Sequence, residues 1–372
     1  MQKKLISLGL MSGTSADGVD ASIVRTNGLN QYDLIKDKYY EYDTDIYKDI
    51  HNLKDKIHNK EDLERNKTEI DNLERRITIF HAGVIKDLNV NNDTIIGFHG
   101  QTIYHNPEER ISKQLGNGKL LNQLVKKDVV FDFRSNDILN GGQGAPLSPV
   151  FHYLISLQNK IKLPVCFLNI GGISNITVIT NKSDLNKLIS KDIGPGNCLI
   201  DTWIRKNSNK KFDQDGLIAL SGTRNEIIFE QAQELYMNRN NKKKLSYDTN
   251  DFDISFLRGL SFEDGVTTLT DFTASVIGEE LSLSLQNIED KVQDILLCGG
   301  GRKNKVLIEK IKKNLLPHIQ LRLIDKLEID GDFIESQAFA FLAVRSIMKL
   351  PISFPNTTGC KIPCTGGSII KN

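Results

Sequence analysis

Residues 8–20, LGLMSGTSADGVD, organise the rest of the chain. An apolar run from Leu5 to Met11 leads into a loop of small and hydroxyl-bearing residues, 12–18. A second apolar run follows over residues 19–24. This pattern predicts two strands joined by a tight loop.

The loop itself has the composition of an anion site. Gly13 and Gly18 allow positive φ and let the backbone approach a ligand closely. The loop N–H groups can face one concavity that suits phosphate oxygens, together with the hydroxyls of Ser12, Thr14 and Ser15. Asp17 would repel a bare phosphate, so a divalent cation held through water is the natural mediator. A plain hairpin turn rich in Gly and Ser is the alternative, because short Gly-rich motifs are weak evidence.

Composition limits the class of protein. The 372 residues carry 48 Lys plus Arg against 47 Asp plus Glu, a formal net charge of +1, which points to neither nucleic acid nor a membrane surface. This length predicts two domains. Lys3 and Lys4 precede a short apolar run, but no small-residue cleavage site follows it, so we predict a buried strand and a cytoplasmic protein.

Five cysteines argue against a secreted disulfide framework, because the number is odd and the chain is long. Cys166, Cys198 and Cys298 stand in apolar or Gly-rich surroundings and are expected to be buried. Cys360 and Cys364 are close in sequence, but no paired His or Cys completes a zinc pattern, so no metal site is expected there.

The first half of the chain continues with alternating patterns. Residues 32–42 favour a strand, and residues 44–88 favour helices with solvated, charged faces. Residues 94–98 predict a strand that ends at the polar sequence HGQT, and residues 129–133 predict another. The Gly/Pro-rich segment 141–149 is the candidate domain crossover.

The second half repeats the opening pattern. Residues 165–170 (VCFLNI) lead into a small-residue turn at 171–175 and a further apolar run at 176–179. The sequence DIGPGN, residues 192–197, then opens a helix, whereas 205–216 and 238–250 indicate solvated loops. Helices are expected over 263–283 and 336–349, and a strand over 294–298 ends in three glycines before a helix opened by Arg302, Lys303 and Asn304.

Three Gly-rich loops therefore follow strands in order: GTSADG, DIGPGN and CGGGRKN. None is a Walker A loop or a GxGxxG fingerprint. Their order resembles the actin, hexokinase and sugar-kinase superfamily. This resemblance implies a two-domain α/β fold with duplicated mixed sheets flanked by helices and a cleft between the domains. We expect domains at 1–140 and 141–349, with the tail 350–372 packing back on the first.

A closer resemblance covers essentially the whole chain. LGLMSGTSADGVDA, FHGQTIYH, FRSNDILNGGQGAPLSP, NIGGISNIT, DIGPGN, CGGGRKN, IESQAFAFLA and the TTG of the tail resemble the anhydro-N-acetylmuramic acid kinase family. Ile193 departs from the family pattern, which usually has Thr after the Asp. The departure removes a hydroxyl near the phosphates and leaves the carboxylate.

The resemblance implies an ATP-dependent kinase of peptidoglycan recycling. It phosphorylates O6 of 1,6-anhydro-N-acetylmuramic acid while water opens the anhydro ring, giving N-acetylmuramic acid 6-phosphate. Asp192 is the expected general base; the alternatives are a helix N-cap and a magnesium ligand. ATP, Mg²⁺ and the sugar are the expected ligands, and homodimer formation is left open.

The resemblance also assigns binding residues. Asp17 would hold magnesium through water, and the nucleotide and its phosphates would contact Ser12, Gly13, Thr14, Ser15, Ala16, Asp17, Gly18, Val19, Gly171, Gly172, Asn175, Gly194, Gly196, Asn197, Gly299, Gly300, Gly301 and Asn304. The sugar and its lactyl carboxylate would contact Gln101, Thr102, Arg134 and Glu335. An ion pair with Asp137 is the alternative for Arg134, and a first-turn helix acid is the alternative for Glu335.

Two other classes of function remain open at this stage. One is a kinase of the same fold that acts on a different small molecule. The other is an actin-like ATPase that polymerises or acts as a chaperone, although the sequence offers no added peptide-binding domain.

Overall fold

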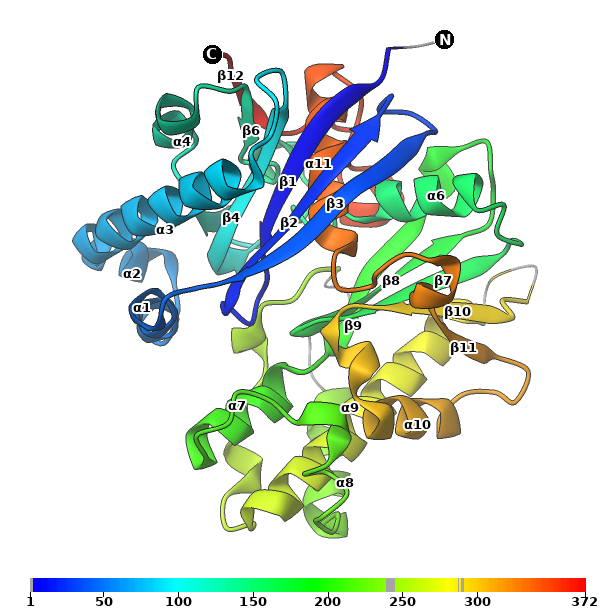
Figure 1. Ribbon diagram of the computed structural model, residues 1–372. Coiled ribbons are helices and arrows are strands. Elements are labelled where there is room, and N and C mark those ends of the chain that lie inside the picture. The colour runs from blue at the N-terminus through cyan, green and yellow to red at the C-terminus, as the bar shows by residue number, and fades with distance from the viewer. Residues whose placement is uncertain (1–2, 239–244, 287, 289–290) are drawn as a thin grey trace. The chain divides into compact units, whose positions relative to one another are not determined.

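The computed structural model describes residues 3–238, 245–286, 288 and 291–372. The chain divides into two compact units, each built around its own sheet (Figure 1). The first unit runs through Ile161, takes in Asn181–Ile189 and resumes at Asp332. The second consists of Lys162–Thr180 and Ser190–Gly331.

The first sheet has the order β12-β6-β4-β1-β2-β3, with β5 paired to β4. Its strands are β1 (Leu5–Ser12), β2 (Gly18–Thr26), β3 (Tyr32–Glu41), β4 (Ile95–Asn106), β5 (Ile111–Leu115), β6 (Val129–Phe131) and β12 (Ser368–Ile370). β1 runs antiparallel to β2 and parallel to β4. The strand–loop–strand prediction for residues 8–20 is therefore confirmed, and this hairpin lies within the sheet.

The second sheet repeats this order as β11-β10-β7-β8-β9. Its strands are β7 (Val165–Ile170), β8 (Ile173–Ile179), β9 (Ile189–Pro195), β10 (Asp294–Cys298) and β11 (Gln320–Leu323). β7 runs antiparallel to β8 and parallel to β10, as β1 does to β2 and β4. The duplicated mixed sheets predicted from the sequence are confirmed. The turn expected at 171–175 is shorter, because β8 already begins at Ile173.

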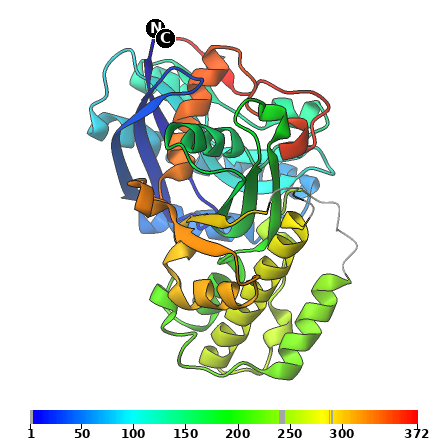
Figure 2. The ribbon, with the colours of Figure 1, turned by 90° about the vertical axis from the view of Figure 1, so that its right-hand side faces the viewer.

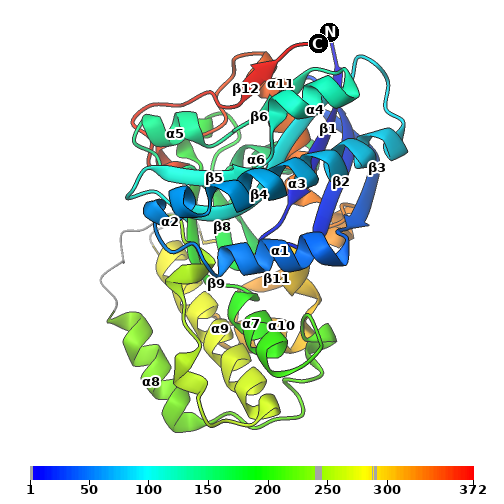
Figure 3. The ribbon, with the colours of Figure 1, turned by 90° about the vertical axis from the view of Figure 1, so that its left-hand side faces the viewer.

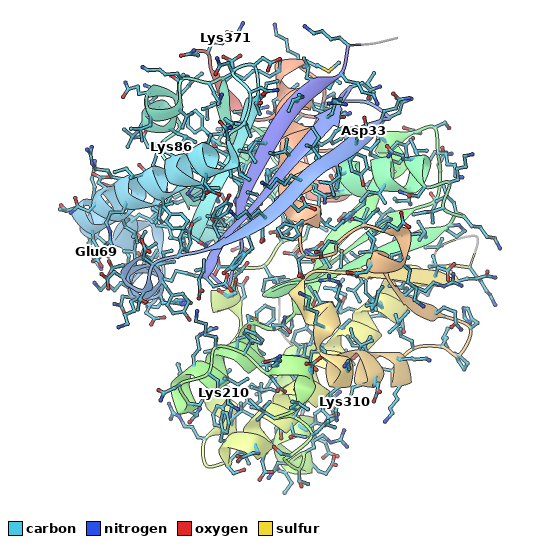
Figure 4. The ribbon with its side chains drawn as sticks, in the orientation of Figure 1. Asp33, Glu69, Lys86, Lys210, Lys310 and Lys371 are labelled. Atoms are coloured by element: carbon cyan, nitrogen blue, oxygen red, sulfur yellow. The ribbon has the colours of Figure 1, made fainter. Side chains whose placement is uncertain are left out.

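Helices α1 (Thr44–Lys54), α2 (Lys60–Arg65) and α3 (Lys67–Leu88) confirm the helical stretch predicted over 44–88. Ile70, Leu73 and Ile77 of α3 share one core with Leu8 and Leu10 of β1. The opposite face of α3 is charged, and Figure 4 shows side chains such as Glu69 and Lys86 standing out from the helix. The charge run is a solvated helix face, as predicted.

α11 (Ile334–Ile347) packs on the other face of the same sheet, away from α3 (Figures 1 and 3). Two strand glycines set this close approach. A Cβ on Gly9 would lie 1.9 Å from the carbonyl oxygen of Ser336, and one on Gly97 would lie 2.5 Å from that of Phe339. Any side chain at either position would meet helix backbone, which cannot move aside.

These contacts explain why the units differ from the expected domain bounds. α6 (Pro149–Gln158) follows the crossover predicted at 141–149, yet it packs on α11, with the rings of Phe151 and Phe341 5.9 Å apart. The chain therefore leaves the first unit only after Ile161, and α11 belongs to the first unit rather than to the second. The tail reaches the first sheet through β12, which pairs antiparallel with β6. The remaining helices of this unit are α4 (Gly118–Val125), α5 (Ser135–Leu139) and α12 (Pro355–Thr358).

The second unit places α7 (Cys198–Asn207), α8 (Glu226–Met237) and α10 (Lys305–Lys313) against the long helix α9 (Phe262–Leu285) (Figure 2). Gly265 of α9 lies against the indole of Trp203, whose Nε1–H donates to the carbonyl of Phe262 over 3.0 Å. α8 was not predicted, although Asn225 provides its N-cap by accepting from Ile228 N–H. In the part of the chain that the structure describes, no helix has the length and apolar character needed to cross a membrane.

Candidate functional site

The loop between β1 and β2 has its carbonyl groups engaged by the surrounding protein. Gly13 O accepts from Ala16 N–H and from Gln101 Nε2. Thr14 O lies 3.4 Å from Lys54 Nζ, and Ser15 O lies 3.2 Å from the Nε2 of His51. The loop carbonyls are thus turned towards the protein around them.

Three N–H groups of the same loop, unlike its carbonyl groups, are not engaged by the described part of the surrounding protein. Those of Gly13, Thr14 and Ser15 donate to no acceptor among the described residues. Ala16 adopts φ +57° and is fully buried, which turns the backbone sharply between Gly13 and Asp17. Consecutive N–H groups without a protein acceptor can bind an anion, and a phosphate contact of this loop stays a prediction.

Ser12 differs from the sequence expectation. Its side chain is 1% exposed, and its Oγ lies 2.7 Å from the Tyr42 hydroxyl and 3.3 Å from Nε2 of His81. The Ser12 hydroxyl is therefore engaged inside the protein, and the phosphate contacts expected of Ser12, Thr14 and Ser15 stay predictions. Ser15 Oγ donates to Asp17 Oδ1 over 2.7 Å, so the loop also orders its own carboxylate.

Gln101 and Thr102 lie within β4 rather than after its end. The strand continues to Asn106 because β5 pairs with residues 101–106. Gln101 is fully buried; its Nε2 donates to Gly13 O over 3.0 Å, whereas its Oε1 has no hydrogen-bond partner among the described residues. Thr102 Oγ1 accepts from Gln114 Nε2 over 3.2 Å. Gln101 thus stands beside the loop with one unsatisfied acceptor.

Arg134 does not form the ion pair with Asp137 that was its alternative role. Its guanidinium contacts His99 Nε2 at 2.9 Å and donates to Gly144 O over 2.8 Å. Burial, reinforced by the Arg134 charge, lowers the pKa of His99 well below its usual value, so this ring is neutral and accepts from Arg134. Glu335 is the second residue of α11, which fits a first-turn acid, and its contact with a sugar stays a prediction.

The Asp137 carboxylate instead ties the Gly/Pro-rich segment to the tail. It accepts from the hydroxyls of Ser353 and Thr358 and from Gly144 N–H. Cys360 and Cys364 complete a buried group whose ligand atoms lie within 4.8 Å of one another. Hydroxyl and amide donors already contact the Asp137 carboxylate, and the expectation that no metal binds here stays a prediction.

All five cysteines are buried thiols. Burial raises the pKa of Cys360 and raises that of Cys364 to about 12. The expectation for Cys166, Cys198 and Cys298 is confirmed.

In the second unit, backbone hydrogen bonds join two of the predicted loops. Gly172 O accepts from Gly196 N–H and Cys198 N–H, and Gly171 O accepts from Asn197 N–H. A Cβ on Gly196 would lie 2.2 Å from Gly171 O, so only glycine fits there. Gly194 has φ +136°, and the Oδ1 of Asn175 is buried without a partner among the described residues.

The loop at residues 299–301 packs against the end of β7 and against Asn197. A Cβ on Gly301 would lie 2.3 Å from Ile170 and 3.0 Å from the Asn197 amide. Arg302, 6% exposed, fixes the loop by donating to Asp325 and Asp330 and to Gly299 O. The structure thus brings together residues 171–172, 194–197 and 299–301, which lie at the carboxyl ends of β7, β9 and β10.

Asn304 lies at a helix start, as the sequence predicted, and provides the N-cap. Its Oδ1 accepts from Leu307 N–H over 3.0 Å and caps α10, which begins at Lys305 rather than at Arg302. Residues 300–303 form a short 3₁₀ turn instead. A nucleotide contact of Asn304 stays a prediction.

Asp192 lies inside β9, and Asn197 occupies the N-cap position of α7. The alternative of a helix N-cap for Asp192 is therefore wrong. Its side chain is 8% exposed, its Oδ2 accepts from Tyr247 N–H over 2.7 Å, and its own N–H donates to Leu245 O. Residues 245–247 thus hold Asp192, whereas residues 239–244 of the predicted solvated loop lie outside the described part of the chain.

The repeated strand order, with loops at the strand ends, gives the duplicated α/β fold that the resemblance to the actin, hexokinase and sugar-kinase superfamily implied. Residues 5–372 match the family model described as anhydro-N-acetylmuramic acid kinase. The chain belongs to the anhydro-N-acetylmuramic acid kinase family. Whether its two units enclose a cleft stays a prediction.

Curated members of the same family align with nearly the whole chain. An anhydro-N-acetylmuramic acid kinase of Pelagibacter ubique is 53% identical, covering 100% of both chains. One of Zymomonas mobilis is 37% identical over 98% of this chain and 99% of its own. A solved glucokinase of the ROK family from Streptomyces griseus, covering 91% of this chain and 98% of its own, has 12% identity and a TM-score of 0.40, a remote likeness that decides nothing about the site.

Proposed function

We propose that this protein is an ATP-dependent kinase that converts 1,6-anhydro-N-acetylmuramic acid and water to N-acetylmuramic acid 6-phosphate. The observation that carries the proposal is the family match over residues 5–372, which includes all three Gly-rich loops and Asp192. The product belongs to the recycling of cell-wall peptidoglycan.

The proposed step couples two substitutions, one at the anomeric carbon and one at the γ-phosphorus. The Asp192 carboxylate takes a proton from water, and the water oxygen forms a bond to the anomeric carbon as the bond from that carbon to O6 breaks. O6 then bonds to the γ-phosphorus of ATP, and ADP leaves with the bridging oxygen. Burial of Asp192 and its backbone contacts with residues 245–247 fix the carboxylate in position, as a general base requires.

The first unit supplies binding groups for this reaction. The N–H groups of Gly13, Thr14 and Ser15 suit phosphate oxygens, because such preorganised donors stabilise developing charge. The unsatisfied Oε1 of Gln101 suits a sugar hydroxyl. The Arg134 guanidinium suits the lactyl carboxylate through paired hydrogen bonds.

The loop also fits magnesium. Asp17 is half-buried and already oriented by Ser15, and a carboxylate beside phosphate-binding amides is a suitable partner for the waters of Mg²⁺. When bound, magnesium would neutralise charge on the β- and γ-phosphates. Asp17 and Ser15 are the residues that would hold its waters.

Isotope labelling tests the proposed reaction. The purified protein is incubated with ATP, magnesium and the anhydro sugar in ¹⁸O water, and the product is examined by mass spectrometry. The label should appear at the anomeric position of a phosphorylated sugar with an open ring. A phosphorylated product that keeps its anhydro bridge would instead indicate an ordinary sugar kinase, and no phosphorylated sugar would contradict the substrate.

Asp17→Asn tests the magnesium site. The amide keeps an oxygen that can accept from Ser15, but it loses the charge that attracts the hydrated cation. We expect the magnesium concentration for half-maximal activity to rise about tenfold, since hydrogen bonds to charged groups contribute roughly 1.5–3 kcal/mol. Asp33→Asn, at a surface ion pair with Lys4, is the matched control and should leave the magnesium requirement unchanged. An unchanged requirement in Asp17→Asn would make Asp17 a structural turn residue.

A further inference from the structure

The side chains of Tyr42, Ser12 and His81 form a linear chain of hydrogen bonds at the start of the β1–β2 loop. All three are buried, with exposures of 4%, 1% and 0%. They come from three separate elements: Ser12 ends β1, Tyr42 follows β3, and His81 lies in α3. None of the three was expected from the sequence to interact with the others.

The direction of each hydrogen bond follows from His81. Its Nδ1 lies 2.8 Å from the carbonyl oxygen of Ile77, which can only accept, so Nδ1 carries the proton. Burial lowers the pKa of His81 to about 4, so the ring is neutral near pH 7. Its Nε2 is therefore an acceptor, and Ser12 must donate to it.

Tyr42 completes the chain. Since the Ser12 proton points to His81, the serine oxygen is left to accept from the Tyr42 hydroxyl at 2.7 Å. Burial raises the pKa of Tyr42, which keeps this donor protonated. The Tyr42 backbone N–H also donates to Asp17 O over 2.9 Å. Tyr42 therefore holds both ends of the loop, through its side chain at Ser12 and its backbone at Asp17.

From these contacts we propose that His81 and Tyr42 are positioning residues for phosphate binding. They act through Ser12, which anchors the loop and does not contact the phosphates itself. The chain fixes the start of the loop so that the N–H groups of Gly13, Thr14 and Ser15 keep one direction. This inference rests on the proposed function only in assuming that the loop binds the phosphates of ATP.

Two substitutions at residue 81 distinguish the loss of the hydrogen-bond acceptor from the loss of the imidazole ring. His81→Gln places a side-chain oxygen near the position of Nε2 and can still accept from Ser12. His81→Asn is shorter, resembles the Nδ1 side of the ring and leaves Ser12 without its acceptor. Tyr42→Phe removes only the hydroxyl, and Ser12→Ala removes the centre of the chain.

Calorimetric titration with Mg·ATP and, separately, with adenosine provides the measurement. We expect His81→Asn, Tyr42→Phe and Ser12→Ala each to raise the Kd for Mg·ATP about 3- to 10-fold, the range of one buried hydrogen bond. The Kd for adenosine should not change, because adenosine has no phosphate. His81→Gln should lie close to the wild type. His81→Asn added to Ser12→Ala should cause no further loss, since both remove the same chain.

Each contrary result has a definite meaning. Unchanged Mg·ATP affinity in folded His81→Asn or Tyr42→Phe would overturn the proposal, as would additive losses in the double variant. An equal loss of affinity for Mg·ATP and for adenosine would indicate general structural damage and would also contradict the proposal. If His81→Asn does not fold, Tyr42→Phe combined with Ser12→Ala decides the matter in the same way. Failure of the wild type to bind Mg·ATP would contradict the proposed function instead.

Discussion

Asp192→Asn is expected to lower turnover by a factor on the order of 10²–10⁴, because an amide cannot take the proton from water. The substitution keeps the size of the side chain and a hydrogen-bond acceptor. Asp192 lies within β9 and accepts from Tyr247 N–H, and the amide oxygen of Asn can accept from the same donor. We therefore expect near-normal thermal stability and Mg·ATP affinity. Steady-state kinetics and thermal unfolding measure the two properties separately.

Asp87→Asn is the matched control for this variant. Asp87 is exposed on α3 and interacts with Lys38 and Tyr40, so losing its charge should hardly affect turnover. An Asp192→Asn protein that unfolds early but keeps its turnover when folded would show that Asp192 is structural. Glu335 would then be the next candidate for the base.

Gly9→Ala is expected to destabilise the first unit strongly. The new Cβ would lie 1.9 Å from Ser336 O and 2.5 Å from Ala340 N, both backbone atoms of a buried helix. Overpacking of this kind costs about 3 kcal/mol or more. For a unit of this size that corresponds to a fall in Tm of roughly 6–12 °C, which differential scanning calorimetry can measure.

Gly83→Ala is the control for Gly9→Ala because the substitution is the same. Gly83 is exposed in α3, and a Cβ there would meet nothing within 4 Å. Alanine should raise the stability of this helix position by about 0.5–1 kcal/mol. A Gly9→Ala protein as stable as the wild type would mean that α11 does not approach the sheet as closely as described.

Local patterns predicted much of the fold. The apolar runs around residues 12–18 and 171–172 are short and bounded by glycines, so β1, β2 and β7 could be placed from sequence spacing alone. The repeat of strand, small-residue turn and strand indicated the duplicated sheets. The helices over 44–88 followed from their apolar periodicity.

What the sequence could not predict depends on contacts between distant residues. α11 joins the first unit through Gly9 and Gly97, more than 200 residues earlier in the chain. Asp192 was expected at a helix start because the glycines and proline that follow it resemble a loop, yet β9 continues to Pro195. His81 was not singled out, since one histidine on the apolar face of a helix carries no signal of a serine 69 residues away.

The burial of all five thiols has a practical consequence for spectroscopy. Maleimides and thiol-reactive nitroxide labels are attacked by thiolates, and buried thiols with a raised pKa react slowly. A cysteine introduced at an exposed position, such as Glu61 on α2, should therefore be modified selectively in the otherwise native chain. Fluorescent or spin labels can then be attached without first replacing the native cysteines, two of which pack beside Asp137.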